Sequence, residues 1–210
     1  MVVKPNGRSA ADYLPPTPSL KSLRAAAAGC RGCDLYKDAT QTVFGEGAAR
    51  ARVMFIGEQP GDSEDKAGHP FVGPAGKLLH KAMLEAGIDP KTAYITNAVK
   101  HFKFVVRGKR RIHAKPRTIE IRACAPWLQA EIKQVRPAVV VALGATAAQA
   151  LLGAGFRLTL HRGEVMQSPL AAAVLATVHP SSILRAPDAE ARHSEYAMFV
   201  NDLRIVASPA

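Results

Sequence analysis

Four short apolar runs, each bounded by turn residues and rich in β-branched side chains, occupy residues 52–56, 93–99, 138–143 and 173–178. Runs of this length favour strands that are buried on both faces of a sheet. Between them, apolar residues recur at helical spacing. One helix face would consist of Leu78, Leu79, Ala82, Met83 and Ala86, and another of Ile121, Cys124, Leu128, Ile132 and Val135. Further helices are expected over residues 20–28, 145–152 and 189–206. Pro74 suits the first turn of the helix that contains Leu78, and Gly87 suits its end.

Strands that alternate with helices predict βαβ units and a sheet that is covered on both faces. We therefore expect an α/β fold of three layers, α/β/α, with a central, mainly parallel, four-stranded sheet. A chain of 210 residues is long enough for one domain with a normal hydrophobic core. We expect this domain over residues 19–210. Residues 1–18 lack an apolar period and are rich in proline, so they are expected to form a flexible arm.

Polar motifs follow three of the four apolar runs, at the points where the strands would end. They are Gly57-Glu58-Gln59-Pro60-Gly61-Asp62, Asn97 and His179-Pro180-Ser181-Ser182. In open parallel sheets, ligands bind at the carboxyl ends of the strands. The three motifs are therefore expected to converge on one pocket.

Each of these motifs also has an ordinary structural explanation. The acidic motif lacks the spacing of a dinucleotide-binding turn, so it is either a surface turn or a site that acts on a positive centre or a nucleophile. Asn97 could cap a turn, yet a buried carboxamide must find partners, and its donor and acceptor match the edge of a pyrimidine. Phe71 could belong to the core or stack on a planar base. His179 could be an ordinary core histidine.

The chain is strongly basic, with a formal net charge of +11 from 28 Lys and Arg against 17 Asp and Glu. This excess favours a polyanionic partner, although charge alone leaves DNA, RNA, an anionic membrane and a role in solubility open. The charge is concentrated in one short stretch that contains Lys100, Lys103, Arg107, Lys109, Arg110, Arg111, Lys115 and Arg117. Such a block is typical of a mobile segment that contacts a partner.

The three cysteines are Cys30, Cys33 and Cys124, and His101 follows the second apolar run. Three thiolates cannot complete a site of four ligands, but imidazole can replace a thiolate on iron or zinc. The spacing predicts a metal site, for which zinc and an iron–sulfur cluster remain equal alternatives. Taken alone, Cys30 and Cys33 could also be a redox pair or two buried thiols.

In order along the chain, these motifs resemble those of the family 4 uracil-DNA glycosylases, and the match spans nearly everything after residue 28. It rests on Glu58-Gln59-Pro60-Gly61-Asp62 with Glu64-Asp65, Pro70-Phe71-Val72-Gly73-Pro74-Ala75-Gly76, Thr96-Asn97-Ala98-Val99-Lys100 and His179-Pro180-Ser181-Ser182. The resemblance implies the uracil-DNA glycosylase fold and a [4Fe-4S] cluster. The chain departs from family 4 by having His101 where the third cysteine would stand, and by inserting residues 107–113. Both departures, together with Gln59, resemble the UdgX group.

The resemblance implies an enzyme that excises uracil from DNA and then joins His113 covalently to C1′ of the abasic site, in a single turnover. The catalytic residues would be His113, Glu58, His179 and Asn97. Uracil would contact Gly57, Gln59, Asp62, Phe71, Asn97 and His179. DNA would contact Lys100, Lys109, Arg110, Arg111, Ser181, Ser182 and Arg185. The [4Fe-4S] cluster would be bound by Cys30, Cys33, His101 and Cys124.

Other functions remain open at this point. The chain could be a family 4 enzyme that turns over without an adduct, an iron–sulfur electron carrier, or an iron–sulfur protein that binds nucleic acid without catalysis. It has no apolar run of membrane-spanning length and does not begin like a signal peptide. We therefore expect a cytoplasmic, monomeric DNA-repair protein that acts on uracil-containing DNA and has no membrane partner.

Overall fold

The computed structural model describes residues 9–207, and their core is a six-stranded sheet in the order β1–β3–β2–β6–β8–β7. Four strands are parallel neighbours: β3 (Tyr94–Asn97), β2 (Val53–Gly57), β6 (Val139–Leu143) and β8 (Ala171–Thr177). Antiparallel strands lie at the two edges: β1 (Glu46–Gly47) and β7 (Val165–Ser168). The expected mainly parallel α/β fold is confirmed, and the four apolar runs are its parallel strands. The edge strands were not expected because neither contains an apolar run.

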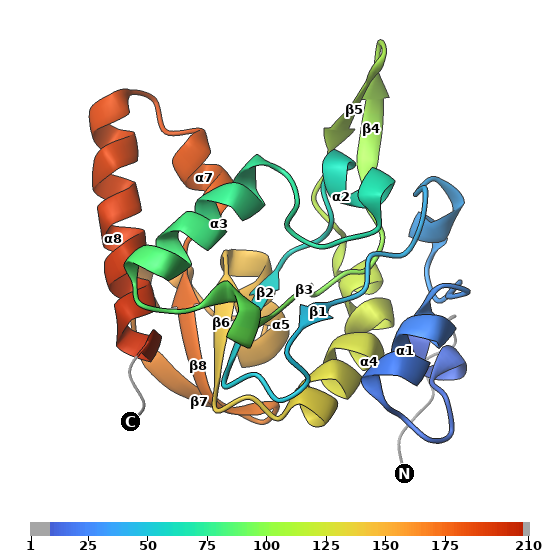
Figure 1. Ribbon diagram of the computed structural model, residues 1–210. Helices are drawn as coiled ribbons and strands as arrows, with labels where there is room; N and C mark the ends of the chain where they lie inside the picture. Colours follow the sequence, from blue (N-terminus) through green and yellow to red (C-terminus); the bar gives the residue numbers. More distant parts are fainter. Residues whose placement is uncertain (1–8, 208–210) are drawn as a thin grey trace.

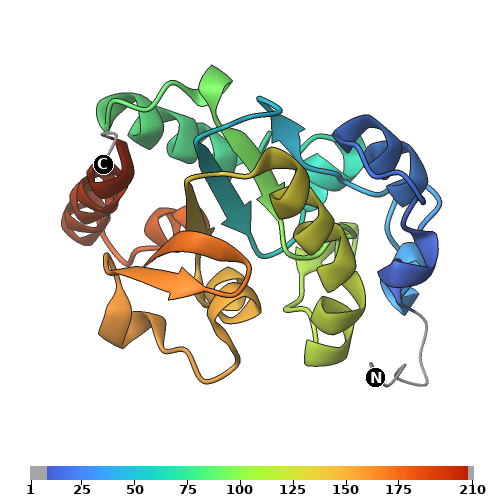
Figure 2. The ribbon, with the colours of Figure 1, turned by 90° about the horizontal axis from the view of Figure 1, so that it is seen from below.

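Helices cover both faces of this sheet (Figure 1). The four longest of the connecting helices are α3 (Pro74–Glu85), α4 (Thr118–Val135), α5 (Ala145–Leu152) and α8 (Ala189–Ala207). α3 and α8 pack on the face that carries Phe55, whereas α4 and α5 pack on the face that carries Ile56 (Figure 2). Successive residues of a strand thus enter different cores, which explains why the central strands are apolar throughout.

The helix boundaries follow the sequence signals closely. α3 begins at Pro74, and Gly87, just beyond its end, has a φ of 83° that suits glycine. The remaining helical segments are η1 (Ala10–Tyr13), α1 (Leu20–Ala27), η2 (Asp34–Lys37), α2 (Asp62–Ala67), η3 (Pro90–Thr92), α6 (Leu158–His161) and α7 (Pro180–Leu184). Within residues 9–207, no helix combines the length and the apolar character that crossing a membrane requires.

The amino-terminal segment is more ordered than its composition suggests. Ser9 caps η1 by accepting a hydrogen bond from the backbone of Ala11, and Ala10 is buried in a core cluster with Trp127. A Cβ atom at Gly32 would lie 2.6 Å from the backbone nitrogen of Ala10, so the two segments are in close contact. Residues 10–13 thus form a helix that packs on the domain, residues 1–8 lie outside the described part of the chain, and the flexible arm stays a prediction.

The basic block folds into a β-hairpin that stands away from the main sheet (Figure 1). Its strands are β4 (Phe104–Arg107) and β5 (Arg110–His113), and they pair antiparallel with Phe104 opposite His113. Gly108 begins the two-residue turn with a φ of 58°, as the tight hairpin turns require. The sequence predicted a mobile basic loop here. The structure has a hairpin instead, in which the basic Arg111 of β5 binds Asp62 and Asp65 of α2 and lies over the Phe104 ring.

Candidate active site

The carboxyl ends of β2, β3 and β8 bring the three polar motifs together. A Cβ atom at Gly57 would lie 2.3 Å from Oδ1 of Asn97 and 2.7 Å from Cζ of Phe71, so only glycine fits at this position. The ring centroids of Phe71 and His179 are 5.9 Å apart. We call this group the strand-end site and define it as Gly57, Glu58, Phe71, Asn97 and His179. Its members come from segments that the sequence analysis expected to meet.

Phe71 is held in an unusual backbone conformation. Its φ is 55°, in the left-handed region that bulky residues rarely adopt, and its side chain is buried. A Cβ atom at Gly76 would lie 1.7 Å from the carbonyl oxygen of Phe71, so glycine is required there as well. Strained backbone of this kind persists only where the surrounding structure fixes it, and it is concentrated at functional sites. The ring therefore has a fixed position against Asn97 and Gly57.

Asn97 has an unmet hydrogen-bonding requirement. The residue is 2% exposed, and its Oδ1 atom is buried without a hydrogen-bond partner among residues 9–207. Its backbone carbonyl, by contrast, accepts a hydrogen bond of 2.7 Å from Nζ of Lys100. A buried acceptor without a partner costs free energy that a ligand can recover by donating to it. The strand-end site thus offers an acceptor to an N–H group of a planar molecule.

His179 is arranged as a neutral hydrogen-bond donor. The backbone N–H of Ser181 donates to Nδ1 of His179 over 3.1 Å, which leaves the ring proton on Nε2. Burial lowers the pKa of His179 to about 4, with Arg185 and His113 acting in the same direction and Glu58 opposing them. The imidazole is therefore uncharged near neutral pH and can donate from Nε2.

Glu58 joins the strand-end site to the hairpin. Its Oε1 lies 3.3 Å from Nε2 of His113, whose side chain is half exposed. Its Oε2 accepts a hydrogen bond from the hydroxyl of Thr146. Burial alone would raise the pKa of Glu58, but the hydrogen bonds from His113 and Thr146 and the nearby imidazoles lower it below its usual value. The carboxylate is therefore ionised and already in contact with the histidine.

Arg111 holds the hairpin over this site. Its Nε atom lies 2.6 Å from Oδ1 of Asp62, and its Nη1 atom lies 2.7 Å from Oδ2 of the fully buried Asp65. The guanidinium also lies over the Phe104 ring, 4.9 Å from the centroid. Arg111 was expected to contact DNA and Asp62 to contact uracil. In this structure they bind each other and fix the orientation of β5.

Gln59 fixes the two ends of the same hairpin. Its Nε2 donates to the carbonyl oxygens of Lys103 and Ala114, each over 3.1 Å, and its Oε1 accepts from the backbone N–H of Lys103 over 3.1 Å. The expected contact between Gln59 and uracil stays a prediction. In the structure, the hydrogen bonds of this carboxamide join the segment before β4 to the segment after β5.

The expected phosphate contacts divide into exposed and buried groups. Lys109 and Arg110 on the hairpin are exposed, as are Ser182 and Arg185 around α7. Ser181 bonds to His179.

Lys100 was expected to contact DNA, and the structure contradicts this expectation. Its side chain is 0% exposed, its Nζ atom pairs with the buried Glu131, and it donates to Oγ1 of Thr96 over 2.7 Å. A fully buried ammonium group that is paired with Glu131 cannot reach a phosphate.

Cys30, Cys33 and Cys124 lie near one another beneath the hairpin. Cys30 and Cys124 are buried in one core cluster, with Cys33 packed against it, and none of the three forms a disulfide. The indole N–H of Trp127 donates to Sγ of Cys30 over 3.2 Å, and the backbone N–H of Lys100 donates to Sγ of Cys124 over the same distance. Such N–H···S bonds are typical of thiolates that bind metal.

His101 is connected to the same region through Thr42. The Thr42 hydroxyl donates to the carbonyl of Ala27 over 2.9 Å, so it accepts from Nε2 of His101, 3.0 Å away. The Ala27 carbonyl also accepts from the backbone of Cys30 over 3.0 Å. Burial lowers the pKa of His101 to about 4, so the ring is neutral and Nδ1 keeps a free lone pair. This is the state that a metal ligand requires.

No three His, Cys, Asp or Glu side chains of residues 9–207 stand close enough to hold a single metal ion. A four-iron cluster separates its ligands more widely than one ion does. Burial also raises the pKa of Cys124 to about 12 and raises that of Cys33, so these thiols would be protonated unless a metal group stabilised their thiolates. The N–H···S bonds and the neutral imidazole are compatible with a metal group on these four residues, and the identity of that group stays a prediction.

Thr146 is the member of this arrangement that the sequence analysis missed. It lies in Gly144-Ala145-Thr146, directly after the third apolar run and therefore at the same edge of the sheet as the other motifs. This position at the end of a strand was the signal from which a role for Thr146 could have been predicted. It was overlooked because the segment contains no titratable residue.

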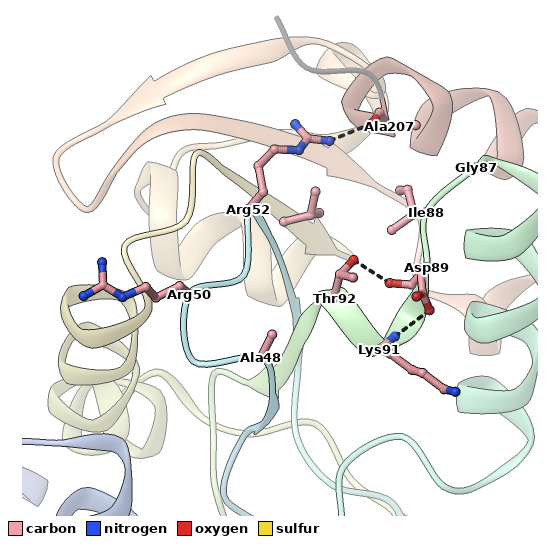
Figure 3. Close-up of a pocket in the computed structure, with 10 residues that line it drawn as sticks. Ala48, Arg50, Arg52, Gly87, Ile88, Asp89, Lys91, Thr92 and Ala207 are labelled. Carbon is pink, nitrogen blue, oxygen red and sulfur yellow. Dashed lines mark hydrogen bonds between the residues drawn. The ribbon is translucent and has the colours of Figure 1, made fainter.

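A separate hollow lies at the opposite end of β2, away from the strand-end site (Figure 3). It has a volume of about 400 Å³ and is bordered by the ends of α3 and α8. Arg50 and Lys91 extend to opposite sides of it in Figure 3, and Arg52 donates to the carbonyl of Ala207 over 2.8 Å. The cations around this hollow do not converge on a common point, so it offers no obvious chemistry.

Comparison with known proteins identifies the family to which the chain is similar. The family model of the uracil DNA glycosylase superfamily matches residues 44–204. A type-4 uracil-DNA glycosylase of Thermotoga maritima is 39% identical over 157 residues, which cover 74% of this chain and 78% of that protein. The type-4 protein of Archaeoglobus fulgidus is 34% identical over 177 residues, covering 80% and 85%. A type-5 uracil-DNA glycosylase of Pyrobaculum aerophilum is 31% identical over 184 residues, covering 79% and 77%.

Proposed function

Because the chain belongs to the uracil-DNA glycosylase superfamily, we propose that it excises uracil from DNA and that His113 then bonds covalently to the abasic site. The observation that carries the second part is the contact between Nε2 of His113 and Oε1 of Glu58, over 3.3 Å, beside the strand-end site. It combines a nucleophile with a carboxylate that can take its proton.

Recognition of uracil follows from the groups that the strand-end site leaves unpaired. A base within a duplex is inaccessible, so the enzyme acts on single strands or flips the nucleotide out of the stack. Phe71 stacks on the extruded ring. The unpaired Oδ1 of Asn97 accepts the ring N–H of uracil, and its amide N–H group donates to the adjacent carbonyl.

Bond cleavage moves the electron pair of the glycosidic bond onto uracil. His179 donates from Nε2 to a uracil oxygen as this negative charge develops, and a buried, pre-oriented donor is effective at that moment. The sugar becomes positively charged at C1′, and the ionised Glu58 offsets this charge. The uracil anion then takes a proton from solvent.

The covalent step forms a carbon–nitrogen bond at C1′. One ring nitrogen of His113 supplies the electron pair, and Glu58 accepts the proton from the other. Imidazole bound through nitrogen is a poor leaving group, so the enzyme is consumed in one turnover. The hydrogen bonds from Arg111 of the hairpin to Asp62 and Asp65, and from Gln59 to the two ends of the hairpin, support this step because they restrict the position of His113 before DNA binds.

One experiment tests excision and attachment together. The protein is mixed with uracil-containing single-stranded DNA, and with the same strand containing thymine, and is then analysed by denaturing electrophoresis and by an assay of free uracil. We expect a heat-stable protein–DNA product with the uracil strand only, and one uracil per protein. Release of many uracils per protein without the product would indicate an ordinary family 4 enzyme. Equal behaviour of both strands would indicate binding without catalysis.

We also propose that Cys30, Cys33, His101 and Cys124 hold a [4Fe-4S] cluster. When bound, such a cluster joins segments that are far apart in the sequence and so stabilises the fold. The N–H···S bonds to Cys30 and Cys124 and the neutral ring of His101 support this assignment.

Replacing Cys124 with alanine should remove the brown colour and the iron and sulfide, and should lower the melting temperature. The cause is the loss of one ligand from a group that links α4 to the amino-terminal segments. Cluster-free protein of both forms provides the control, since there the substitution removes only one buried sulfur and the difference should largely vanish. Zinc without iron or sulfide in anaerobically prepared protein would contradict the assignment, and so would an unchanged melting temperature.

DNA binding should depend strongly on salt because Lys109, Arg110 and Arg185 are exposed. Each phosphate contact to a single strand contributes about −0.7 to the slope of log K against log salt. Replacing Lys109 and Arg110 with serine should make this slope less negative by roughly 1.4. Lys91→Ser, beside the hollow at the far end of the sheet, is the control. If the double variant at Lys109 and Arg110 has the same slope as the wild type and as Lys91→Ser, the hairpin does not contact phosphate.

A further inference from the structure

The end of β6 is a fourth strand end at this site. Gly144 follows β6 with a φ of 90°, and a Cβ atom there would lie 3.1 Å from Cβ of His179. Thr146 is two residues further, in the first turn of α5, and is 4% exposed. Its hydroxyl donates to Oε2 of Glu58. This segment therefore touches two residues of the strand-end site without carrying a titratable group itself.

The two oxygens of Glu58 have different partners. Oε2 is bonded to Thr146, and Oε1 faces Nε2 of His113 over 3.3 Å. The Thr146 side chain is 4% exposed and its hydroxyl is bonded to Glu58, so the surrounding core fixes the position of this donor. Because one oxygen is fixed, the carboxylate cannot rotate freely, and the other oxygen is directed toward the hairpin.

We propose that Thr146 is a positioning residue that fixes the Glu58 carboxylate so that its second oxygen receives the proton of His113. This inference rests on the proposed function, since it concerns the same covalent step. Thr146 is buried and touches neither DNA nor uracil in this account. Its effect is on the rate of the step and not on DNA affinity.

The hydrogen bond has a second consequence, for the protonation of Glu58. The titratable groups that face Glu58 are His113 from β5 and His179 from the end of β8. Thr146 adds a hydrogen bond to the ionised form and thereby helps to lower the pKa of Glu58. The amino end of α5, which carries Thr146, also favours a negative charge. Loss of the hydroxyl should thus raise the pKa of the carboxyl group.

The test compares Thr146→Val, which keeps the shape and removes the donor, with Thr146→Ser, which keeps the donor. Single-turnover rates of adduct formation on uracil-containing single-stranded DNA are measured between about pH 3.5 and pH 8, because the pKa of Glu58 is below its usual value. A hydrogen bond to a charged group is worth roughly a tenfold change in rate when it is lost. We expect the valine variant to be about tenfold slower, with the acid side of its pH profile moved to higher pH. The serine variant should resemble the wild type, and all three proteins should bind DNA equally.

Equal rates and equal pH profiles for the wild type and the valine variant would overturn the proposal. Equal loss in the serine and valine variants would also overturn it, because packing and not the hydrogen bond would then matter. A wild type that forms no adduct would refute the proposed function instead. In that case the carboxyl ¹³C shift of Glu58, followed against pH, still decides whether Thr146 binds the carboxylate: the valine variant should titrate at higher pH than the serine variant, and coincident titrations would reject the contact.

Discussion

Replacing His113 with alanine should abolish the protein–DNA adduct and leave the fold intact. The side chain is half exposed on β5, so its loss removes little packing. Its partner Glu58 keeps the hydrogen bond from Thr146 and therefore remains in place. With the imidazole gone, water can occupy the space beside C1′, so uracil should still be released, slowly and now in repeated turnovers. Denaturing electrophoresis and the assay of free uracil measure the two results separately.

His161→Ala is a suitable control for this variant, because His161 is also partly exposed and also pairs with a glutamate, Glu164, over 2.8 Å. It should form the adduct at the wild-type rate. The assignment fails if the adduct persists in the His113 variant, or if mass spectrometry of the wild-type product places the DNA on another residue. Repeated turnover by the wild type without any adduct would refute it as well.

Replacing Asn97 with alanine should lower the rate of uracil excision by about 10² to 10³, the range found when a buried group that stabilises a transition state is removed. The carboxamide offers the acceptor and the donor that match uracil, and it is rigid because Lys100 binds its backbone carbonyl. Its proposed contacts are to the base and not to phosphate, so weak affinity for uracil-free DNA should be unchanged.

The matched control is Asn201→Ala on the exposed side of α8, where the carboxamide binds only Arg204. Its excision rate should equal that of the wild type. Single-turnover assays at saturating enzyme separate the chemical step from binding. If Asn97→Ala excises uracil at the wild-type rate, the base is recognised elsewhere. If Asn97→Ala loses affinity for uracil-free DNA to the same extent as it loses excision rate, the role of Asn97 is structural.

Sequence patterns predicted the parallel strands and their order of appearance because each strand is buried on both faces. Phe55 and Ile56 enter different cores, so the whole run had to be apolar. The same regularity located the site. Once the sheet is parallel, the residues that follow Gly57, Asn97 and His179 must lie along one edge.

Contacts between distant elements were less accessible to sequence reasoning. Lys100 looked like a member of the basic block, since nothing near it in the sequence shows that Glu131 on α4 would face it in the core. The hydrogen bonds of Gln59 to Lys103 and Ala114 could not be foreseen either, because these residues are more than forty positions away in the sequence. Propensity and spacing describe each element alone, whereas these roles depend on how elements meet.

The hairpin has a consequence for how such an enzyme can arise. Its two strands pair only with each other, so they can be gained or lost without altering the register of the main sheet. Alignment of His113, however, requires Gln59 on the β2 side and the two carboxylates of α2 that bind Arg111. The hairpin alone would thus provide the imidazole of His113 without the residues that orient it. The proposed covalent reaction therefore depends on two separate parts of the chain, the hairpin and the residues that orient it.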